Sequence, residues 1–421
     1  MRSPAIGFAD LRLAVVSPFV DRRHGTERAL AELIERLADT YHCEIHLFSQ
    51  RVDDVNLASR DSAGPGQGGA IYWHKVPRIP GPHLLQFIGW FYLNRLWRWS
   101  VARSGRFSFD CVLSPGINCS DADAIIIHVL FHRLRELALE ARDATWPQKI
   151  SFFRRVHRQI YYAWLARWER RIYGNPRISL SAVSQRTSNL LAQLFHRQSV
   201  RVISNGVDAS QFSPSARVAA RAEARALRDF EEDEFVLLLI GNDWRVKGLS
   251  TILEAMTRLE GKPIRLLVAG SDAPGAFQEL AKRLGVSERC SWDFVVASVL
   301  DLYAAADLYV SPSREDSFGL PVAEAMACGL PAITSSFAGI AGLIRDGIDG
   351  FVLQDPYDSA TLAQLVQLLY SESDLRRRIG ETAAKTALEW TWDRNAAAVW
   401  EFVTETVSKA HPVPKPGGSA R

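Results

Sequence analysis

The stretch from Ser311 to Pro331, SPSREDSFGLPVAEAMACGLP, restricts the possible fold more than any other part of the sequence. An apolar strand over residues 307–310 leads into it, residues 311–319 have loop character, and Pro321 suits the first turn of a helix that ends at Gly329. The first N–H groups of such a helix have no partners within it, so they and the helix dipole attract an anion. The stretch therefore predicts a strand, a loop and a helix that bind a diphosphate or a sugar oxygen.

Two carboxylates accompany this predicted anion site. Asp316 lies in the loop, and Glu324 lies about one turn inside the helix, where its side chain leans back towards the helix start. An ionised carboxylate only accepts hydrogen bonds, which suits the paired hydroxyls of a ribose or a hexose. The two carboxylates thus indicate that a sugar or a nucleotide binds beside the anion site.

The same stretch resembles the E-x7-E signature of retaining nucleotide-sugar glycosyltransferases with the GT-B fold, especially those of family 4. The matching residues are Phe318, Gly319, Leu320, Pro321, Glu324, Ala325, Met326, Gly329 and Pro331. The first glutamate of the signature is Asp316 here, and Glu315 stands beside it. The contact with the donor sugar is therefore either shortened by one methylene group or taken over by Glu315.

A second loop carries positive charge at a predicted helix start. The buried strand Phe235 to Ile240 is followed by Gly241-Asn-Asp-Trp-Arg-Val-Lys-Gly248 and then by an amphipathic helix. A lysine at such a position neutralises a diphosphate as a point charge, and an arginine can bind it bidentately. The loop resembles the G-R-x-x-x-x-K-G loop of the same family. Lys247 matches, but the usual arginine is Asn242, so Arg245 is its expected replacement.

The first half of the chain offers further candidate residues. Gly25 opens a predicted helix after the strand Leu11 to Ser17, where a residue without a side chain permits close approach of a phosphate. His128 follows the apolar run AIII, at the carboxyl end of a predicted strand, where open α/β sheets bind ligands. Transferases of the family often have a His or an Asp in this part of the first domain, so the resemblance implies that His128 and Asp123 are candidate acceptor-site residues.

Strands alternate with helices along the whole chain, which predicts parallel, Rossmann-like sheets. A length of 421 residues favours two domains. The run Asn-Gly-Val-Asp at 205–208 resembles the segment that begins the interdomain region of the family. The resemblance implies an α/β, GT-B fold with two Rossmann-like domains that face a central cleft. We expect an acceptor domain at 1–204, a donor domain at 205–392, a helix at 393–410 that crosses back to the first domain, and a disordered tail at 411–421.

Charge is distributed unevenly between the two halves. Residues 1–200 contain 27 Lys and Arg against 17 Asp and Glu, whereas the remainder of the chain is acidic. The segments Pro82 to Ser108 and Lys149 to Arg177 are rich in arginine and aromatic residues, and together they contain one acid. Such segments, if helical, can lie in a layer of anionic lipid headgroups. We expect a peripheral position on the inner face of the cytoplasmic membrane and no nucleic-acid partner, although the aromatic residues could instead belong to the core.

The resemblance implies that the chain moves a hexose from a nucleotide sugar, UDP- or GDP-linked, to a membrane- or envelope-associated glycan or lipid, with retention of configuration and without a metal or another cofactor. Implied catalytic residues are Lys247, Arg245, Asp316 and His128. Implied donor-binding residues are Gly25, Lys247, Arg245, Asp316, Ser317, Phe318, Gly319, Leu320 and Glu324. Two alternatives remain open: a sugar-nucleotide 2-epimerase, and a protein that binds a sugar nucleotide without catalysis.

Overall fold

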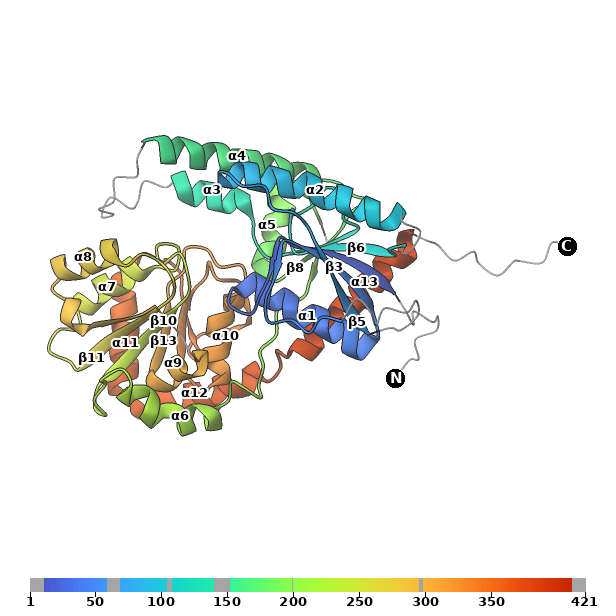
Figure 1. Ribbon diagram of the computed structural model, residues 1–421. Coiled ribbons are helices and arrows are strands. Elements are labelled where there is room, and N and C mark those ends of the chain that lie inside the picture. Colours follow the sequence, from blue (N-terminus) through green and yellow to red (C-terminus); the bar gives the residue numbers. More distant parts are fainter. Residues whose placement is uncertain are drawn as a thin grey trace.

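The computed structural model describes residues 11–58, 69–103, 108–139, 152–198, 200–294 and 298–410. They form two α/β domains that lie side by side (Figure 1). The predicted tail at 411–421 and nearly all of the glycine-rich segment at 59–70 lie outside the described residues.

A parallel seven-stranded sheet forms the centre of the first domain, in the order β5-β3-β1-β6-β7-β8-β9. Its inner strands form because continuous apolar runs such as AIII at 124–127 are buried on both faces. The strands are β1 Arg12–Val16, β3 Glu44–Ser49, β5 Ala70–Lys75, β6 Cys111–Ser114, β7 Ala124–Ile127, β8 Ser179–Ala182 and β9 Arg201–Val202. The short strands β2 (Phe19–Val20) and β4 (Arg51–Val52) pair separately.

Helices cover this sheet, and three of them lie together along one side of the domain (Figure 1). The helices are α1 Gly25–Tyr41, α2 His83–Arg103, α3 Phe131–Leu139, α4 Phe152–Tyr173 and α5 Gln185–Phe195. Helix α1 buries Leu30, Leu33 and Leu37. Helices α2 and α4 pack through aromatic rings, with the centroids of Phe91 and Trp168 4.6 Å apart. Part of the aromatic content of these two segments therefore belongs to the core.

A second parallel sheet, in the order β12-β11-β10-β13-β14-β15, forms the centre of the other domain. Its order reverses beside the first strand of the domain, as in nucleotide-binding Rossmann folds, and the first sheet reverses in the same way beside β1. The strands are β10 Phe235–Ile240, β11 Ile264–Ala269, β12 Cys290–Asp293, β13 Leu308–Ser311, β14 Ala332–Ser335 and β15 Phe351–Leu353. The helices are α6 Pro214–Ala226, α7 Leu249–Thr257, α8 Gly275–Arg283, α9 Val299–Ala305, α10 Leu320–Ala327, α11 Ser359–Ser371 and α12 Ser373–Ala387, with 3-10 turns η2 Ser287–Arg289 and η3 Gly339–Leu343.

The last helix, α13 (Trp392–Ala410), crosses back to the first domain, as predicted. It packs against α1, where the rings of Tyr41 and Trp400 stack with centroids 5.0 Å apart. Arg36 of α1 also donates a 2.8 Å hydrogen bond to Asp393. These contacts attach the crossing helix to the first domain. The exact division at residues 204 and 205 remains a prediction.

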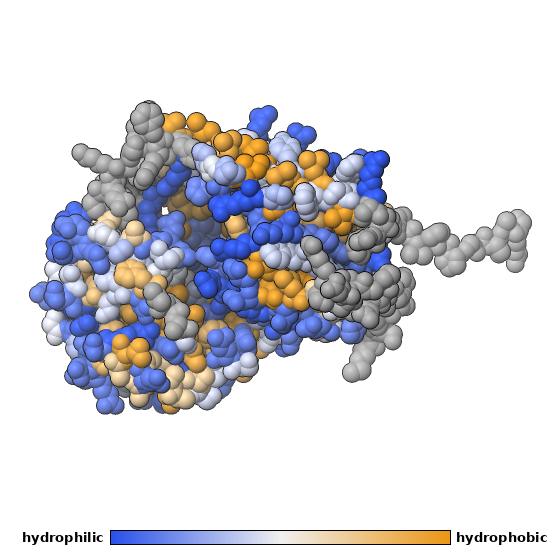
Figure 2. All heavy atoms as spheres, in the orientation of Figure 1, coloured by the Kyte–Doolittle hydropathy of each residue, from blue (hydrophilic) through white to orange (hydrophobic). Residues whose placement is uncertain are grey.

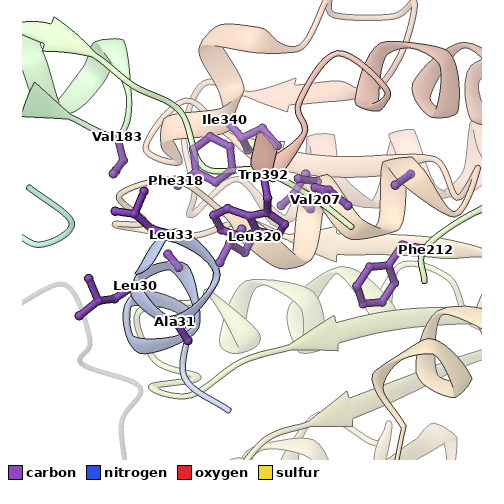
Figure 3. Close-up of a cluster of buried hydrophobic side chains, with 14 of the residues drawn as sticks. Leu30, Ala31, Leu33, Val183, Val207, Phe212, Phe318, Leu320, Ile340 and Trp392 are labelled. Carbon is purple, nitrogen blue, oxygen red and sulfur yellow. The ribbon is translucent and has the colours of Figure 1, made fainter. Parts of the chain in front are cut away.

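Apolar side chains from both domains meet in one continuous core, which Figure 3 shows where α1 approaches the start of α10. The first domain contributes Leu30, Ala31, Leu33 and Val183, and the second contributes Phe318, Leu320 and Ile340. This core places the start of α1 against the start of α10. Within the described residues, no helix combines the length and the hydropathy required to span a bilayer.

Candidate active site

The Ser311 to Pro331 stretch has the predicted strand, loop and helix. Gly319 precedes α10 with φ of 100°, in the left-handed region that a residue without a Cβ adopts readily, and Pro321 lies in the first turn. The loop is held against the segment after β14, because the Asp316 N–H donates to Phe337 O (3.1 Å) and the Gly339 N–H donates to Asp316 O (2.8 Å). The backbone of this loop is therefore fixed where the two domains meet.

The two loops that the sequence analysis considered separately come together at Asp316. Lys247 Nζ lies 2.5 Å from Asp316 Oδ2, and both side chains are largely buried. The approach depends on Gly248, whose φ is 79° and whose added Cβ would lie 2.1 Å from the Pro312 carbonyl oxygen. Asp316 Oδ1 also accepts a 3.3 Å hydrogen bond from the Phe318 N–H. A lysine, a carboxylate and the start of α10 thus share one small volume.

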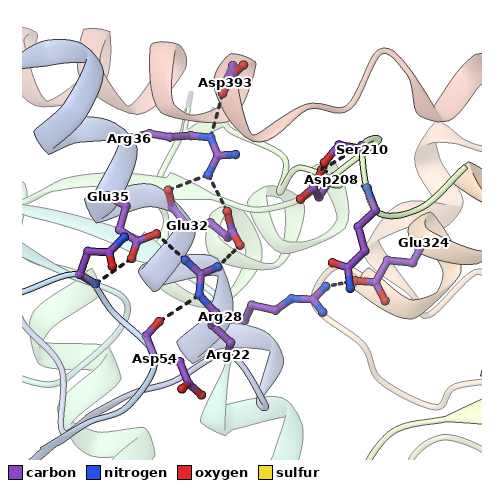
Figure 4. A network of polar contacts seen from close by, with 12 residues as sticks. Arg22, Arg28, Glu32, Glu35, Arg36, Asp54, Asp208, Ser210, Glu324 and Asp393 are labelled. Atoms are coloured by element: carbon purple, nitrogen blue, oxygen red, sulfur yellow. Dashed lines mark hydrogen bonds and ion pairs between the residues drawn. The ribbon is translucent and has the colours of Figure 1, made fainter. Parts of the chain in front are cut away.

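Glu324 is only 2% exposed, and both of its carboxylate oxygens have cationic or hydroxyl partners. Arg28 of α1 forms an ion pair with Oε1 across the domain junction (Figure 4). The Tyr303 hydroxyl donates a 2.7 Å hydrogen bond to Oε2. Burial lowers the pKa of Arg28 and raises the pKa of Tyr303 well above its usual value. Neither partner was predicted as a site residue, because Arg28 is distant in sequence from the signature and Tyr303 lies outside it, in the preceding helix α9.

Glu315 faces the first domain and not Lys247. Arg133 Nε of α3 and Arg186 Nη2 of α5 lie 3.2 and 3.1 Å from the same oxygen, Glu315 Oε2. The Arg186 guanidinium also lies over the Phe337 ring, 4.7 Å from its centroid. Glu315 therefore links the two domains, while the neighbouring Asp316 lies with the lysine. The sequence contains no signal for this contact, since Arg133 and Arg186 belong to no recognised motif.

Arg245 and Asn242 have different partners in the second loop. Arg245 Nη2 donates a 2.7 Å hydrogen bond to the Leu137 carbonyl oxygen of α3, so this side chain reaches the first domain. Asn242 Oδ1 accepts hydrogen bonds from the N–H and the hydroxyl of Ser271, each 2.9 Å long. Asn242 therefore fixes a neighbouring loop, and Arg245 is the arginine of this segment that reaches the domain junction.

His128 lies at the carboxyl end of β7, as predicted, but it is buried. It lines a small cavity of about 10 Å³, together with Asn205 and Asn395. The Nδ1–H donates to Ile126 O (3.2 Å), while Nε2 has no hydrogen-bond partner of normal geometry. Burial lowers the pKa of His128 to about 4, although the Ile126 carbonyl and the Asn205 side chain oppose this shift. His128 is therefore neutral at physiological pH and is less accessible than Lys247 or Asp316.

The remaining candidates lie in different surroundings. Asp123 accepts a 2.8 Å hydrogen bond from the Val112 N–H at the amino end of β7, the opposite end from His128. A Cβ added at Gly25 would meet Leu320 Cδ1 at 3.7 Å, so Gly25 is close to the start of α10. Among the described residues, no group of three or more His, Cys, Asp or Glu could hold a metal ion.

The protein has two facing Rossmann-like domains, a crossing C-terminal helix and a carboxylate–lysine pair near the domain junction. These features define the class of GT-B glycosyltransferases. Residues 23–211 match the family model described as Glycosyltransferase Family 4, and residues 220–386 match the model described as Glycosyl transferases group 1. Together the two models cover most of the chain. The chain therefore belongs to the glycosyltransferases that these two models describe, and its fold is GT-B.

Individual relatives agree with this assignment. A D-inositol 3-phosphate glycosyltransferase of Salinispora arenicola is 31% identical over 231 residues, which are 51% of each protein. The chain thus spans about half the length of the curated relatives that it matches. The crystal structure of WaaG, a glycosyltransferase involved in lipopolysaccharide biosynthesis, has a TM-score of 0.70 at 19% identity and covers 95% of this chain and 100% of its own. Anabaena HepE in complex with UDP-glucose has a TM-score of 0.63 at 17% identity, with 95% and 99% covered.

Proposed function

We propose that the chain is a retaining glycosyltransferase that moves a hexose from a UDP- or GDP-sugar to a glycan or lipid of the cell envelope. The convergence of Lys247, Asp316 and the start of α10 at the domain junction is the observation that carries this proposal. A cation and a helix start suit a diphosphate, and a carboxylate suits sugar hydroxyls. The structure of Anabaena HepE, which has a similar fold, contains UDP-glucose, and this ligand is a nucleotide sugar of the class proposed here.

Each site residue has a proposed role in this reaction. Lys247 and Arg245 stabilise the negative charge that develops on the leaving diphosphate, so no metal ion is required. Asp316 binds the donor sugar, the amides of the following loop bind the diphosphate, and Glu324 accepts hydrogen bonds from the ribose. The loop residues are Ser317, Phe318, Gly319 and Leu320. Gly25 leaves room for the diphosphate, and neutral His128 supports the acceptor side of the site.

A thermal-shift screen tests this proposal. Wild-type protein is melted with UDP-, GDP-, ADP- and dTDP-sugars in the presence of EDTA. A donor at about 100 times its dissociation constant should add about 2.7 kcal/mol of stability, because it binds only the folded state. We expect one nucleotide series to raise Tm without a divalent metal. A shift that appears only after magnesium or manganese is added would contradict the proposed role of Lys247 and Arg245.

We further propose that helix α2 docks the first domain on an anionic membrane. Leu85, Tyr92, Leu96 and Trp99 are each more than half exposed, and their spacing places them on one face of α2. The Arg103 guanidinium lies over Trp99, 4.9 Å from the ring centroid. Apolar side chains extend over the surface formed by α2 and α4 (Figure 2). Arg95 and Arg98 of α2 pair with Asp121, whereas the exposed apolar stripe and Arg103 lie on a helix without an acid, which suits a layer of anionic headgroups.

Vesicle co-sedimentation tests the docking proposal with a matched pair of substitutions. Leu96 and Leu388 are both 60% exposed, but Leu388 belongs to the second domain. Leu96→Gln should lower binding to anionic vesicles about tenfold, because a buried leucine contributes about 1.5–3 kcal/mol, whereas Leu388→Gln should have no effect. Binding should also weaken as salt rises, since headgroup attraction is screened within about 8 Å. Equal binding to neutral and anionic vesicles would refute electrostatic docking.

A further inference from the structure

The ion pair between Arg28 and Glu324 connects the first domain to the carboxylate that we propose as the ribose ligand. Arg28 lies in the first turns of α1, and Glu324 lies in α10 of the other domain. The Arg28 side chain is 19% exposed and the Glu324 side chain is 2% exposed. The contact therefore lies inside the domain junction and differs from a solvated surface pair.

In this arrangement each oxygen of Glu324 has a partner, and the carboxylate has almost no exposed surface. Arg28 holds Oε1, and the Tyr303 hydroxyl holds Oε2 at 2.7 Å. A ribose diol needs the same acceptor oxygens and must also reach them, but a carboxylate that is 2% exposed leaves no open path from solvent. Arg28 and a bound ribose consequently compete for one carboxylate.

The rest of α1 has a different set of ion pairs, which makes Arg28 distinct on its own helix. Arg22 pairs with Glu32 and Glu35, and Arg36 pairs with Glu32 and with Asp393 of the crossing helix (Figure 4). These contacts fix α1 to its own domain and to α13. Among the ion pairs drawn in Figure 4, that of Arg28 is the one that joins α1 to the signature helix α10.

We propose that Arg28 is a positioning residue that neutralises Glu324 when the donor site is empty and is displaced from it by the donor's ribose. Arg28 thereby lowers donor affinity and keeps the buried carboxylate paired until a nucleotide arrives. This inference rests on the proposed function in one respect, namely that Glu324 binds the ribose.

The first test measures nucleotide affinity by calorimetry in Arg28→Gln and in the control Arg36→Gln. The control removes an arginine of similar exposure from the same helix, since the Arg36 side chain is 26% exposed. The probe is whichever of UDP, GDP, ADP and dTDP binds the wild type. Arg28→Gln should bind it about tenfold more tightly, because an ion pair that competes with the ligand is gone, and Arg36→Gln should bind as the wild type does. Affinity that is unchanged in Arg28→Gln, or weakened and then restored by Arg28→Lys, would overturn the proposal.

A second measurement does not depend on any ligand. Hydrogen exchange of the unliganded protein should be faster over α10 in Arg28→Gln than in the wild type, since a contact across the junction is lost, and Arg36→Gln should leave it unchanged. Unchanged exchange over α10 in Arg28→Gln would overturn the inference. If the wild type binds none of the four nucleotides, the proposed function fails, whereas the exchange result still decides whether Arg28 holds α10.

Discussion

Replacing Glu324 should reduce nucleotide affinity by about 10- to 150-fold, which corresponds to the roughly 1.5–3 kcal/mol of a hydrogen bond to a charged group. Glu324→Gln keeps the size of the side chain but removes the ionised acceptor, and Glu324→Ala removes it entirely. Isothermal titration with the nucleoside diphosphate measures the effect. Unchanged affinity in a folded variant would contradict the assignment of Glu324 to the ribose.

Folding has to be controlled in this experiment, because the substitution leaves the largely buried Arg28 without its partner. Breaking one side of a buried ion pair typically destabilises a protein by about 3–5 kcal/mol. The double variant Arg28→Gln with Glu324→Gln removes both charges and should recover part of that loss. Asp307→Asn is a suitable control, because Asp307 is a partly buried carboxylate of the same domain that pairs with Arg221 and Arg225.

Asp316→Asn should lower turnover far more than Glu315→Gln. Asp316 lies 2.5 Å from Lys247 at the start of α10, so its charge acts where the sugar and the diphosphate are expected. We expect a loss of about 10²–10³-fold, the range seen when one stabilising group of a reacting centre is removed. Steady-state kinetics at saturating donor measure the effect.

Glu315→Gln provides the matched comparison, because it neutralises the adjacent carboxylate. Glu315 contacts Arg133 and Arg186, so its loss should weaken the junction between the domains and leave the chemical step largely intact. The opposite ranking would show that Glu315, and not Asp316, has the role of the first glutamate in the family's signature.

Local signals in the sequence were sufficient for most of the fold. The strand Phe235–Ile240 has the predicted bounds, and the strand predicted at 307–310 lies one residue further along the chain, at Leu308–Ser311. Both were found because each is a continuous apolar run between clear turn residues. The predicted loop and the Pro321 helix start were also correct, since a glycine and a proline fix them locally. Helix α3 was not predicted. The strand Ala332–Ser335 was not identified either, because its four residues are too few to show a periodic pattern.

The partners within the site could not be predicted in the same way. Arg28 was not among the candidate residues, and its contact with Glu324 depends on how the two domains close. His128 lines one cavity with Asn205 and Asn395, which belong to the interdomain segment and the crossing helix. A single sequence contains no signal for contacts of this kind, since they join segments that are far apart along the chain.

Turnover of the donor without an acceptor tests the proposed sugar transfer most directly. Wild-type protein is incubated with the nucleotide sugar selected by the screen, in EDTA, and the products are followed by NMR. We expect slow release of nucleoside diphosphate and free sugar in equal amounts, with the first-formed sugar in the donor's anomeric configuration and with Asp316→Asn nearly inactive. An inverted anomer, a 2-epimerised sugar, no release at all, or release that requires magnesium would contradict a retaining, metal-independent glycosyltransferase.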